Sequence, residues 1–133
     1  MGVLRTVGRG MIATLFLIAG VDVLRHPQPR AEVAHDTLER LRSAVRVVPD
    51  DVTAVRANAA TQLVAATLLT FGKAPRAAAG VLAASLVPTT LAGHAFWTFD
   101  DPAQSAQQRA HFAKNLAILG GLILAALPPE EDG

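Results

Sequence analysis

The chain has 133 residues, the length of one domain, and 51% of them are hydrophobic. Twelve basic residues nearly balance eleven acidic ones, so the net charge of +1 gives no basis for nucleic-acid binding. The lack of cysteine excludes disulfides, thiolate metal sites and iron–sulfur clusters built by this chain.

Four apolar segments predict an all-α protein, an antiparallel bundle of four transmembrane helices. Only the third segment, uncharged over residues 77–99, meets the length of about 20 residues that crosses ~30 Å of hydrocarbon. The other segments need charged ends that reach water, or polar side chains turned into the bundle. The expected spans are 7–24, 54–72, 76–99 and 110–127. The alternative is a soluble four-helix bundle, but segments two to four lack its charged outer stripe.

The long connection between the first two segments contains a further expected helix. Over residues 31–48, apolar side chains recur at steps of three and four on one narrow stripe: Ala34, Leu38, Leu41, Val45 and Val48. This pattern predicts an amphipathic helix that lies on the membrane surface or caps the bundle. The alternative is a short soluble helix packed on a loop.

Local signals mark the later helix boundaries. The GKAPR turn predicts an antiparallel hairpin between segments two and three. Asp101 followed by Pro102 resembles a helix cap followed by a first-turn proline, so the last helix is expected over about 102–127. Pro88 removes one helix hydrogen bond and predicts a kink, with Thr89 and Thr90 able to bond the freed carbonyls.

The distribution of lysine and arginine indicates an orientation. More of these residues lie in residues 25–56 and 100–114 than at the N-terminus and the 72–76 turn. The positive-inside rule therefore places the loops 25–56 and 100–114 in the cytoplasm.

In such a bundle, the polar residues of the four segments meet at one membrane face. Thr90, His94, Trp97 and Asp101 have the spacing of one stripe on a continuous helix. Buried polar groups are costly in a membrane unless they are paired, so we expect them to form a one-sided pocket. The candidate pocket residues are Asp22, Asn58, Gln62, His94, Trp97 and Asn115.

Three of these residues carry specific expectations. His94 can titrate near neutral pH or relay a proton, and the alternative is a structural hydrogen bond. Trp97 either stacks on a ring-shaped ligand or anchors the chain at the membrane interface. Asp22 is expected to pair with Arg25, Arg56 or His94, or else to accept a proton. No residue is assigned a catalytic role.

Metal binding is not predicted. His26, His35 and His111 are present, but no HxxxH or ExxH spacing occurs. A haem held between His94 and His111 is a further alternative.

The chain resembles the DoxX-like integral membrane proteins, in their short actinobacterial form, in four strings: GRGMIATLFLIAGVDVLRHP, RANAATQLVAATLLTFGKAPR, LVPTTLAGHAFWTFDDP and HFAKNLAILGG. The resemblance runs from Gly8 to Leu124. It implies a multi-pass, four-helix protein of the bacterial inner membrane. Its members are linked to quinone-coupled sulfur oxidation and to membrane complexes with redox or detoxification enzymes. The matching positions are Gly8, Arg9, Gly20, His26, Pro27, Asn58, Pro88, His94, Trp97 and Asn115.

Three functions are compatible with these observations. The first is an auxiliary or anchoring subunit of a redox-linked membrane complex, with no cofactor of its own and a membrane or membrane-associated redox protein as partner. The second is a quinone- or lipid-binding oxidoreductase subunit, in which aromatic side chains hold a head group and His94 bonds a carbonyl oxygen. The third is a small-molecule carrier or channel, which would need a homo-oligomer.

Overall fold

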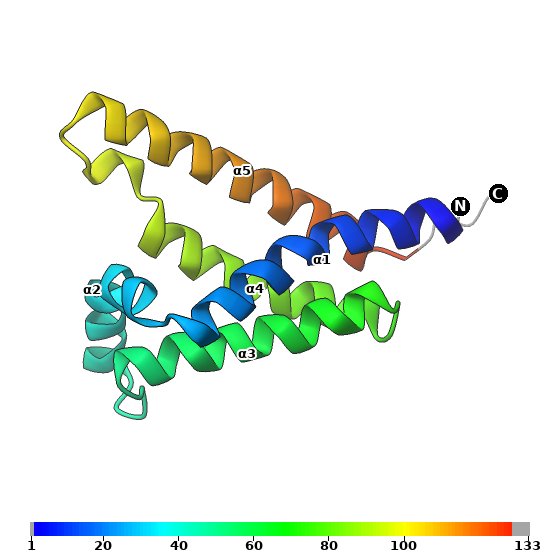
Figure 1. Ribbon diagram of the computed structural model, residues 1–133, viewed down its shortest axis with the longest axis horizontal. Helices are drawn as coiled ribbons and strands as arrows, with labels where there is room; N and C mark the ends of the chain where they lie inside the picture. The colour runs from blue at the N-terminus through cyan, green and yellow to red at the C-terminus, as the bar shows by residue number, and fades with distance from the viewer. Residues whose placement is uncertain (1, 129–133) are drawn as a thin grey trace.

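The computed structural model describes residues 2–128, and every regular element in that part of the chain is helical. This confirms the predicted all-α class. The elements are α1 (Gly2–Arg25), α2 (Gln28–Ala44), α3 (Asp51–Thr70), α4 (Pro75–Gly93), the short 3₁₀ helix η1 (Phe96–Thr98) and α5 (Pro102–Ala126). The four long helices form an elongated bundle, in which α1 begins and α5 ends at the end opposite to α2 (Figure 1).

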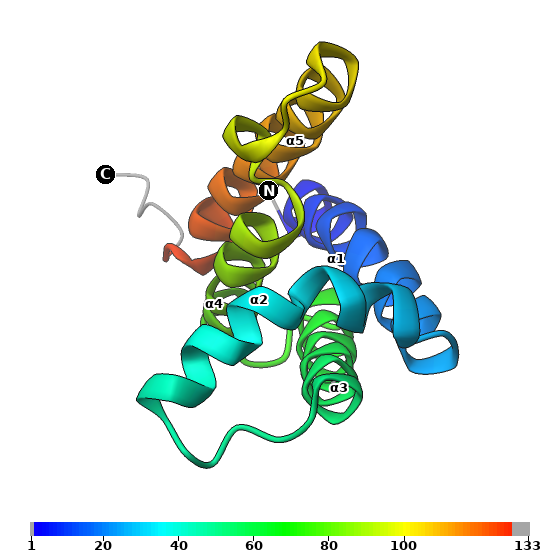
Figure 2. The same ribbon diagram turned by 90° about the vertical axis from the view of Figure 1, so that its left-hand side faces the viewer.

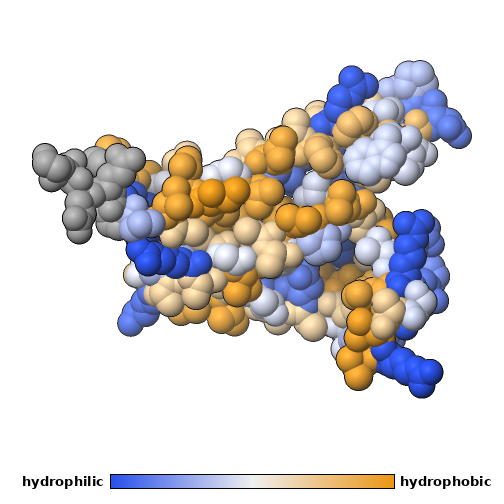
Figure 3. Space-filling view, turned by 180° about the vertical axis from the view of Figure 1, so that it is seen from behind, coloured by the Kyte–Doolittle hydropathy of each residue, from blue (hydrophilic) through white to orange (hydrophobic). Residues whose placement is uncertain are grey.

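Two helices are long and apolar enough to cross a membrane. They are α1, and α4 together with η1 (Pro75–Thr98). The other two long helices reach 20 and 25 residues, but polar side chains in their first turns lower their mean hydropathy. Figure 3 nevertheless shows apolar side chains across the middle of one face and strongly hydrophilic ones gathered mostly toward its two ends.

The core of the bundle is built mainly from alanine and leucine, which let the helices approach closely. Buried residues come from α1, α3, α4 and α5: Ala13, Phe16, Ala65, Ala66, Leu69, Ala78, Ala79, Leu82, Leu86 and Leu122. Among the glycines, the tightest approach is at Gly20. A Cβ atom there would lie 2.7 Å from Leu63 Cγ and 3.3 Å from the Ala59 carbonyl oxygen. The contact of α1 with α3 therefore favours glycine at this position, because a larger residue would have to displace Leu63.

Helix α2 lies across the end of the bundle (Figure 2). It ends at Ala44, four residues earlier than predicted, and Val45 is extended at φ −132° and ψ 114°. β-branched valines followed by Pro49 disfavour the helical conformation there. The predicted apolar stripe is therefore wrong at Val45 and Val48, which lie beyond the helix.

Helix α4 ends at Gly93, so the third apolar segment is not one continuous helix to Phe99. His94 leaves the helical region, with φ −132° and ψ 34°, and the chain turns through η1 before α5 begins. The predicted stripe that joins Thr90 to His94, Trp97 and Asp101 is wrong for this reason. Glycine is a weak helix former, and the chain must reverse here to begin α5.

The helix continues through Pro88. The Thr89 hydroxyl donates to the Ser85 carbonyl at 2.8 Å, and the Thr90 hydroxyl donates to the Leu86 carbonyl at 2.7 Å. These carbonyls follow that of Ala84, which is the one that loses its donor to Pro88. The two threonines therefore reinforce the neighbouring turn and do not satisfy the freed carbonyl.

Several predicted boundaries are confirmed. The Asp101 carboxylate accepts a hydrogen bond from the Gln104 amide at 3.3 Å and caps α5, which runs to Ala126. The predicted hairpin joins α3 to α4 through a short turn in which Gly72 has a φ of +66°, a conformation that favours glycine.

Candidate functional site

A cavity of about 340 Å³ lies among the helices at the end of the bundle that α2 covers. Its wall is mostly apolar, with a few polar and basic side chains, which is the usual composition of a small-molecule site. All five helices contribute to it. The apolar part of the wall includes Leu15, Phe16, Ala19, Val23, Val33, Ala34, Leu38, Leu41, Val55 and Leu86.

Four of the six predicted pocket residues line this cavity, namely Asn58, Gln62, His94 and Asn115. Pro88 lines it too. The i,i+4 spacing of Asn58 and Gln62 on α3 places both side chains on the cavity side of that helix. The structure therefore brings together polar residues from α3, α4 and α5, and Asp22 and Trp97 stay outside.

A chain of hydrogen bonds joins α3 to α4 beside the cavity. Gln62 Nε2 donates to Ser85 Oγ at 2.8 Å, and Ser85 Oγ donates to Asn58 Oδ1 at 2.6 Å. Ser85 was not among the predicted residues. Its signal in the sequence is a lone serine within an apolar segment, one helical turn before Thr89, which also lines the cavity.

Helix α5 is joined to α4 in the same region. Asn115 Nδ2 donates to Thr90 Oγ1 at 3.0 Å, and both residues are buried. The Thr90 hydroxyl donates in turn to the Leu86 carbonyl. The polar groups of Asn115 and Thr90 are thus paired with each other, as burial away from water requires.

His94 is held by α5. Its Nδ1 bonds Gln108 Oε1 at 2.7 Å, and its ring stacks on that of His111 with centroids 5.1 Å apart and planes 28° apart. A carbonyl oxygen only accepts, so Nδ1 carries the proton in this bond, and Nε2 of the neutral ring remains free to accept another. Gln108 was also absent from the predicted residues.

The stacked arrangement does not fit a haem between His94 and His111, because two axial ligands must lie on opposite sides of the iron. Within residues 2–128, no group of three or more His, Asp or Glu side chains is placed to hold a metal ion.

Trp97 is the exposed member of an aromatic cluster whose other rings, Phe96 and Phe112, are half-buried. Its side chain is 58% exposed and makes edge-to-face contacts with Phe96 and Phe112, at centroid distances of 5.2 Å and 5.9 Å. The Arg109 guanidinium lies 5.8 Å from the centre of the Phe96 ring. An exposed tryptophan in such a cluster suits an interfacial anchor better than a ligand-stacking wall.

Asp22 is exposed on α1, off the stripe that α1 buries. In the described part of the chain, the ion pairs are His35–Asp51, Arg42–Glu39 and Arg42–Asp51. The predicted pairing of Asp22 with Arg25, Arg56 or His94 is therefore wrong.

Two cavity residues that sequence reasoning missed are basic. Arg30, near the start of α2, and Lys114, next to Asn115 on α5, both line the cavity. No Asp or Glu among the described residues lines it. Lys114 follows His111 by three positions, so helical spacing alone could have placed it near the site. Arg30 could be placed there only once α2 was known to cross the bundle end.

Polar contacts fasten α2 to the start of α3. His35 Nδ1 bonds Asp51 Oδ2 at 2.7 Å, while Arg42 pairs with Asp51 and donates from Nη2 to the Pro49 carbonyl at 2.8 Å. The hydrogen bond and negative charge of Asp51 raise the pKa of His35. Hydrogen bonds from His35 and Arg42 lower the pKa of Asp51. We call the contacts of His35, Arg42, Pro49 and Asp51 the α2–α3 clasp.

Comparison with known families identifies the chain. The DoxX family model matches residues 4–95, which include nearly all of α1, the whole of α2 to α4 and most of the cavity wall. Neither the curated proteins nor the solved structures contain a match. Because the family match covers more than half of the sequence, this chain belongs to the DoxX family, whose members are membrane proteins.

Proposed function

We propose that this protein is an accessory or anchoring subunit of a redox-linked complex in the bacterial inner membrane, and that its cavity holds a small amphiphile taken from the bilayer. The cavity of about 340 Å³ at one end of the bundle is the observation that carries the proposal. Its apolar wall with few polar groups suits a molecule that has both an apolar chain and a polar head. The class of partner comes from the family resemblance.

Four membrane spans are part of this proposal. Helix α3 has 20 residues, which corresponds to about 30 Å of helix and so to the thickness of a bilayer core. Apolar side chains on α3 and α5 are exposed to the surroundings, among them Val64, Leu116 and Leu124. Such exposure is costly in water and favourable in lipid. In this arrangement α2 lies at one membrane surface, over the mouth of the bundle.

A quinone is the second candidate ligand. The observation that favours it is the ring of His94, which lines the cavity while Nδ1 is engaged by Gln108. A histidine positioned in this way can hydrogen-bond a quinone carbonyl oxygen or exchange a proton with it. In that case the subunit would take part directly in electron transfer by a partner enzyme.

The test is gentle extraction of tagged protein from its own membranes, followed by mass spectrometry of the proteins, lipids and quinones that elute with it. We expect a redox enzyme in stoichiometric amount and an amphiphile bound to the subunit. The paired variants are Ala34→Phe, which fills the cavity, and Ala44→Phe, the same change on the same helix away from it.

The amphiphile should be lost from Ala34→Phe and retained by Ala44→Phe. Recovery of the subunit with neither a stoichiometric protein nor an amphiphile would overturn the proposal.

A further inference from the structure

We propose that the cavity selects an amphiphile with an anionic head group, a carboxylate or a phosphate, and that Arg30 and Lys114 bind that head group. This inference rests on the proposed function only in assuming that the cavity takes an amphiphile. It adds the charge of the ligand and the residues that recognise this charge.

The charges around the cavity have one sign. Arg30 from α2 and Lys114 from α5 line it together with His94, and no carboxylate of residues 2–128 does so. They come from α2, the end of α4 and α5, so three separate elements bring them to one cavity. A cavity lined with basic groups alone attracts anions and disfavours cations.

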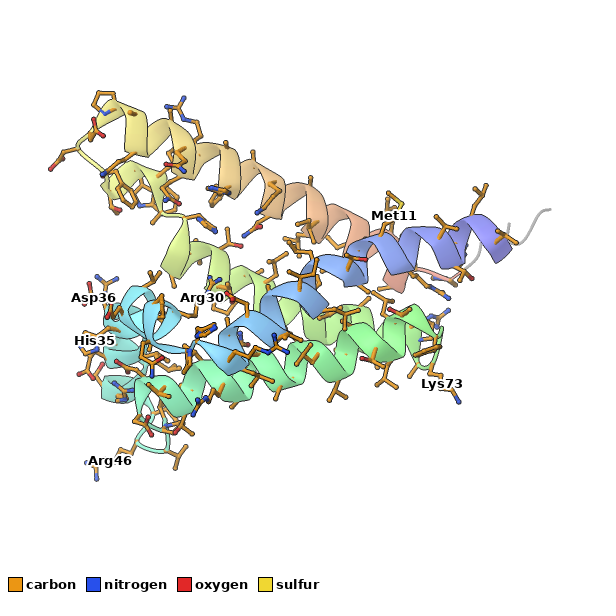
Figure 4. The ribbon with its side chains drawn as sticks, viewed as in Figure 1. Met11, Arg30, His35, Asp36, Arg46 and Lys73 are labelled. Carbon is orange, nitrogen blue, oxygen red and sulfur yellow. The ribbon has the colours of Figure 1, made fainter. Side chains whose placement is uncertain are left out.

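Neither basic residue is neutralised within the described part of the chain. The ion pairs found in residues 2–128 all involve Arg42 or Asp51, at the α2–α3 clasp. Figure 4 shows Arg30 on the side of α2 that faces the bundle, whereas His35 and Asp36 lie on the outer side. Arg30 is half-buried in a mostly apolar wall, where a bound anion would provide the counter-charge, whereas Lys114 is exposed and would add a charge-assisted hydrogen bond.

The Arg30 guanidinium lies beside the end of α4. A Cβ atom at Gly93 would lie 4.0 Å from Arg30 Nη1 and 3.8 Å from Val33 Cγ1. The end of α4 thus packs directly against this side of α2. Arg30 from α2 and Lys114 from α5 reach the cavity from different helices. In the proposal the guanidinium fork and the single ammonium hold one carboxylate or phosphate between them.

The apolar end of the cavity determines how the ligand is oriented. The wall reaches Phe16 and Leu86, which belong to the central core of the bundle. A volume of about 340 Å³ is at the low end of the range for small-molecule sites, roughly 300–1,000 Å³. The head group would therefore lie between Arg30 and Lys114 with the first carbons of one chain directed inward, and a whole two-chain lipid would not fit.

The experiment compares ligands that differ only in charge. Purified full-length protein in a neutral detergent, at about pH 8 where carboxylates are ionised, is titrated with oleate and with methyl oleate, and bound ligand is counted by native mass spectrometry. We expect oleate to bind at least about tenfold more tightly than methyl oleate, because charge-assisted hydrogen bonds add more than one factor of ten. Oleoyl lysophosphatidate and inorganic phosphate are titrated in parallel.

The variants assign the preference to residues. The double variant Arg30→Gln with Lys114→Gln should lose the preference for oleate and keep its weak binding of methyl oleate. The matched control, Arg40→Gln with Arg109→Gln, removes the same charge from the same two helices outside the cavity and should keep the preference. The comparison of oleate with methyl oleate on the wild-type protein needs no variant. It therefore tests the charge preference even if the double variant fails to fold.

The outcomes separate this inference from the proposed function. Equal binding of oleate and methyl oleate would overturn the anionic head group while supporting an amphiphile cavity. Binding of neither would overturn the proposed function itself. Inorganic phosphate that binds as tightly as the lipids would show a free anion as the ligand and overturn the amphiphile. A preference for lysophosphatidate over oleate would support a phosphate head group from lipid.

Discussion

Asn115 on α5 donates a hydrogen bond of 3.0 Å to Thr90 on α4, and both side chains are buried beside the cavity. The bond ties α5 to α4 at the point where Asn115 and Lys114 line the cavity. Replacing Asn115 with Leu removes the donor and leaves the Thr90 oxygen without it. We expect the free energy of unfolding in detergent to fall by about 0.6–2 kcal/mol.

A double-mutant cycle with Thr90→Val measures the interaction itself. The loss in the double variant should be smaller than the sum of the two single losses, because removing both partners leaves no unpaired group. Strict additivity would show that the two side chains do not interact in the folded protein.

Gly20 is a point of close contact between α1 and α3. In Gly20→Ala, the new methyl group would meet Leu63 Cγ at 2.7 Å and must displace it. We expect a loss of about 1–3 kcal/mol in the free energy of unfolding, the usual cost of overpacking. Chemical denaturation in detergent, followed by circular dichroism, measures this loss.

Gly80→Ala provides the matched control in α4, where no atom lies within 4 Å of the added group. This variant should be neutral or more stable by up to about 1 kcal/mol. Equal effects of the two substitutions would contradict the packing of α1 on α3.

The sequence predicted those features that depend on neighbouring residues in the chain, and it missed those that depend on how the helices pack against one another. Residues Asn58 and Gln62 share a helix face by period alone, and Asp101 caps α5 through its own neighbours. Ser85, in contrast, matters because of the rotation of α4 against α3, which no local pattern contains. Arg30 matters because α2 crosses the bundle end.

The largest misplacement, that of Trp97, has a similar origin. The apolar run from 77 to 99 is long enough for a continuous helix, and its hydropathy predicts one. The chain instead leaves the helix at Gly93 so that α5 can return along the bundle. This places His94 against Gln108 and His111, and carries Trp97 away from the cavity to an exposed position in an aromatic cluster.

The proposed four spans make a prediction about membrane sides. The chain has no cysteine, so each of Arg46→Cys, Lys73→Cys and Gln104→Cys introduces a single thiol at an exposed position. Four spans place residues 46 and 104 on one side and residue 73 on the other. With a membrane-impermeant maleimide, we expect positions 46 and 104 to react in inverted vesicles and position 73 to react in intact cells.

Solubilised protein, in which all three thiols should react, is the control for accessibility. Reaction of position 73 on the same side as position 46 would contradict a crossing by α3. If position 73 reacts in inverted vesicles and positions 46 and 104 react in intact cells, the four spans are supported and only the predicted orientation is reversed.

The α2–α3 clasp predicts a dependence on pH outside the spans. Because Asp51 raises the pKa of His35 above its ordinary 6.5, the contribution of protonated His35 is complete below about pH 6.5 and is lost as the pH rises through the raised value. The pKa of Asp51 is lowered from 3.8, so the contribution of Asp51 is present above about pH 3.8 and is lost only as the pH falls through the lowered value. The clasp is therefore strongest between these limits, and above them the pairing of Asp51 with Arg42 remains.

Hydrogen–deuterium exchange, corrected for the intrinsic effect of pH, measures this directly in the amides of α2. Protection should be greater at about pH 5.5 than at about pH 8.5, because the contribution of protonated His35 falls as the pH rises. His35→Gln should abolish the difference, whereas His26→Gln changes an exposed histidine outside the clasp and should preserve it. A pH dependence that survives in His35→Gln would show that another group titrates. The α2–α3 clasp would then not be the element that holds α2, and with it Arg30, at the cavity.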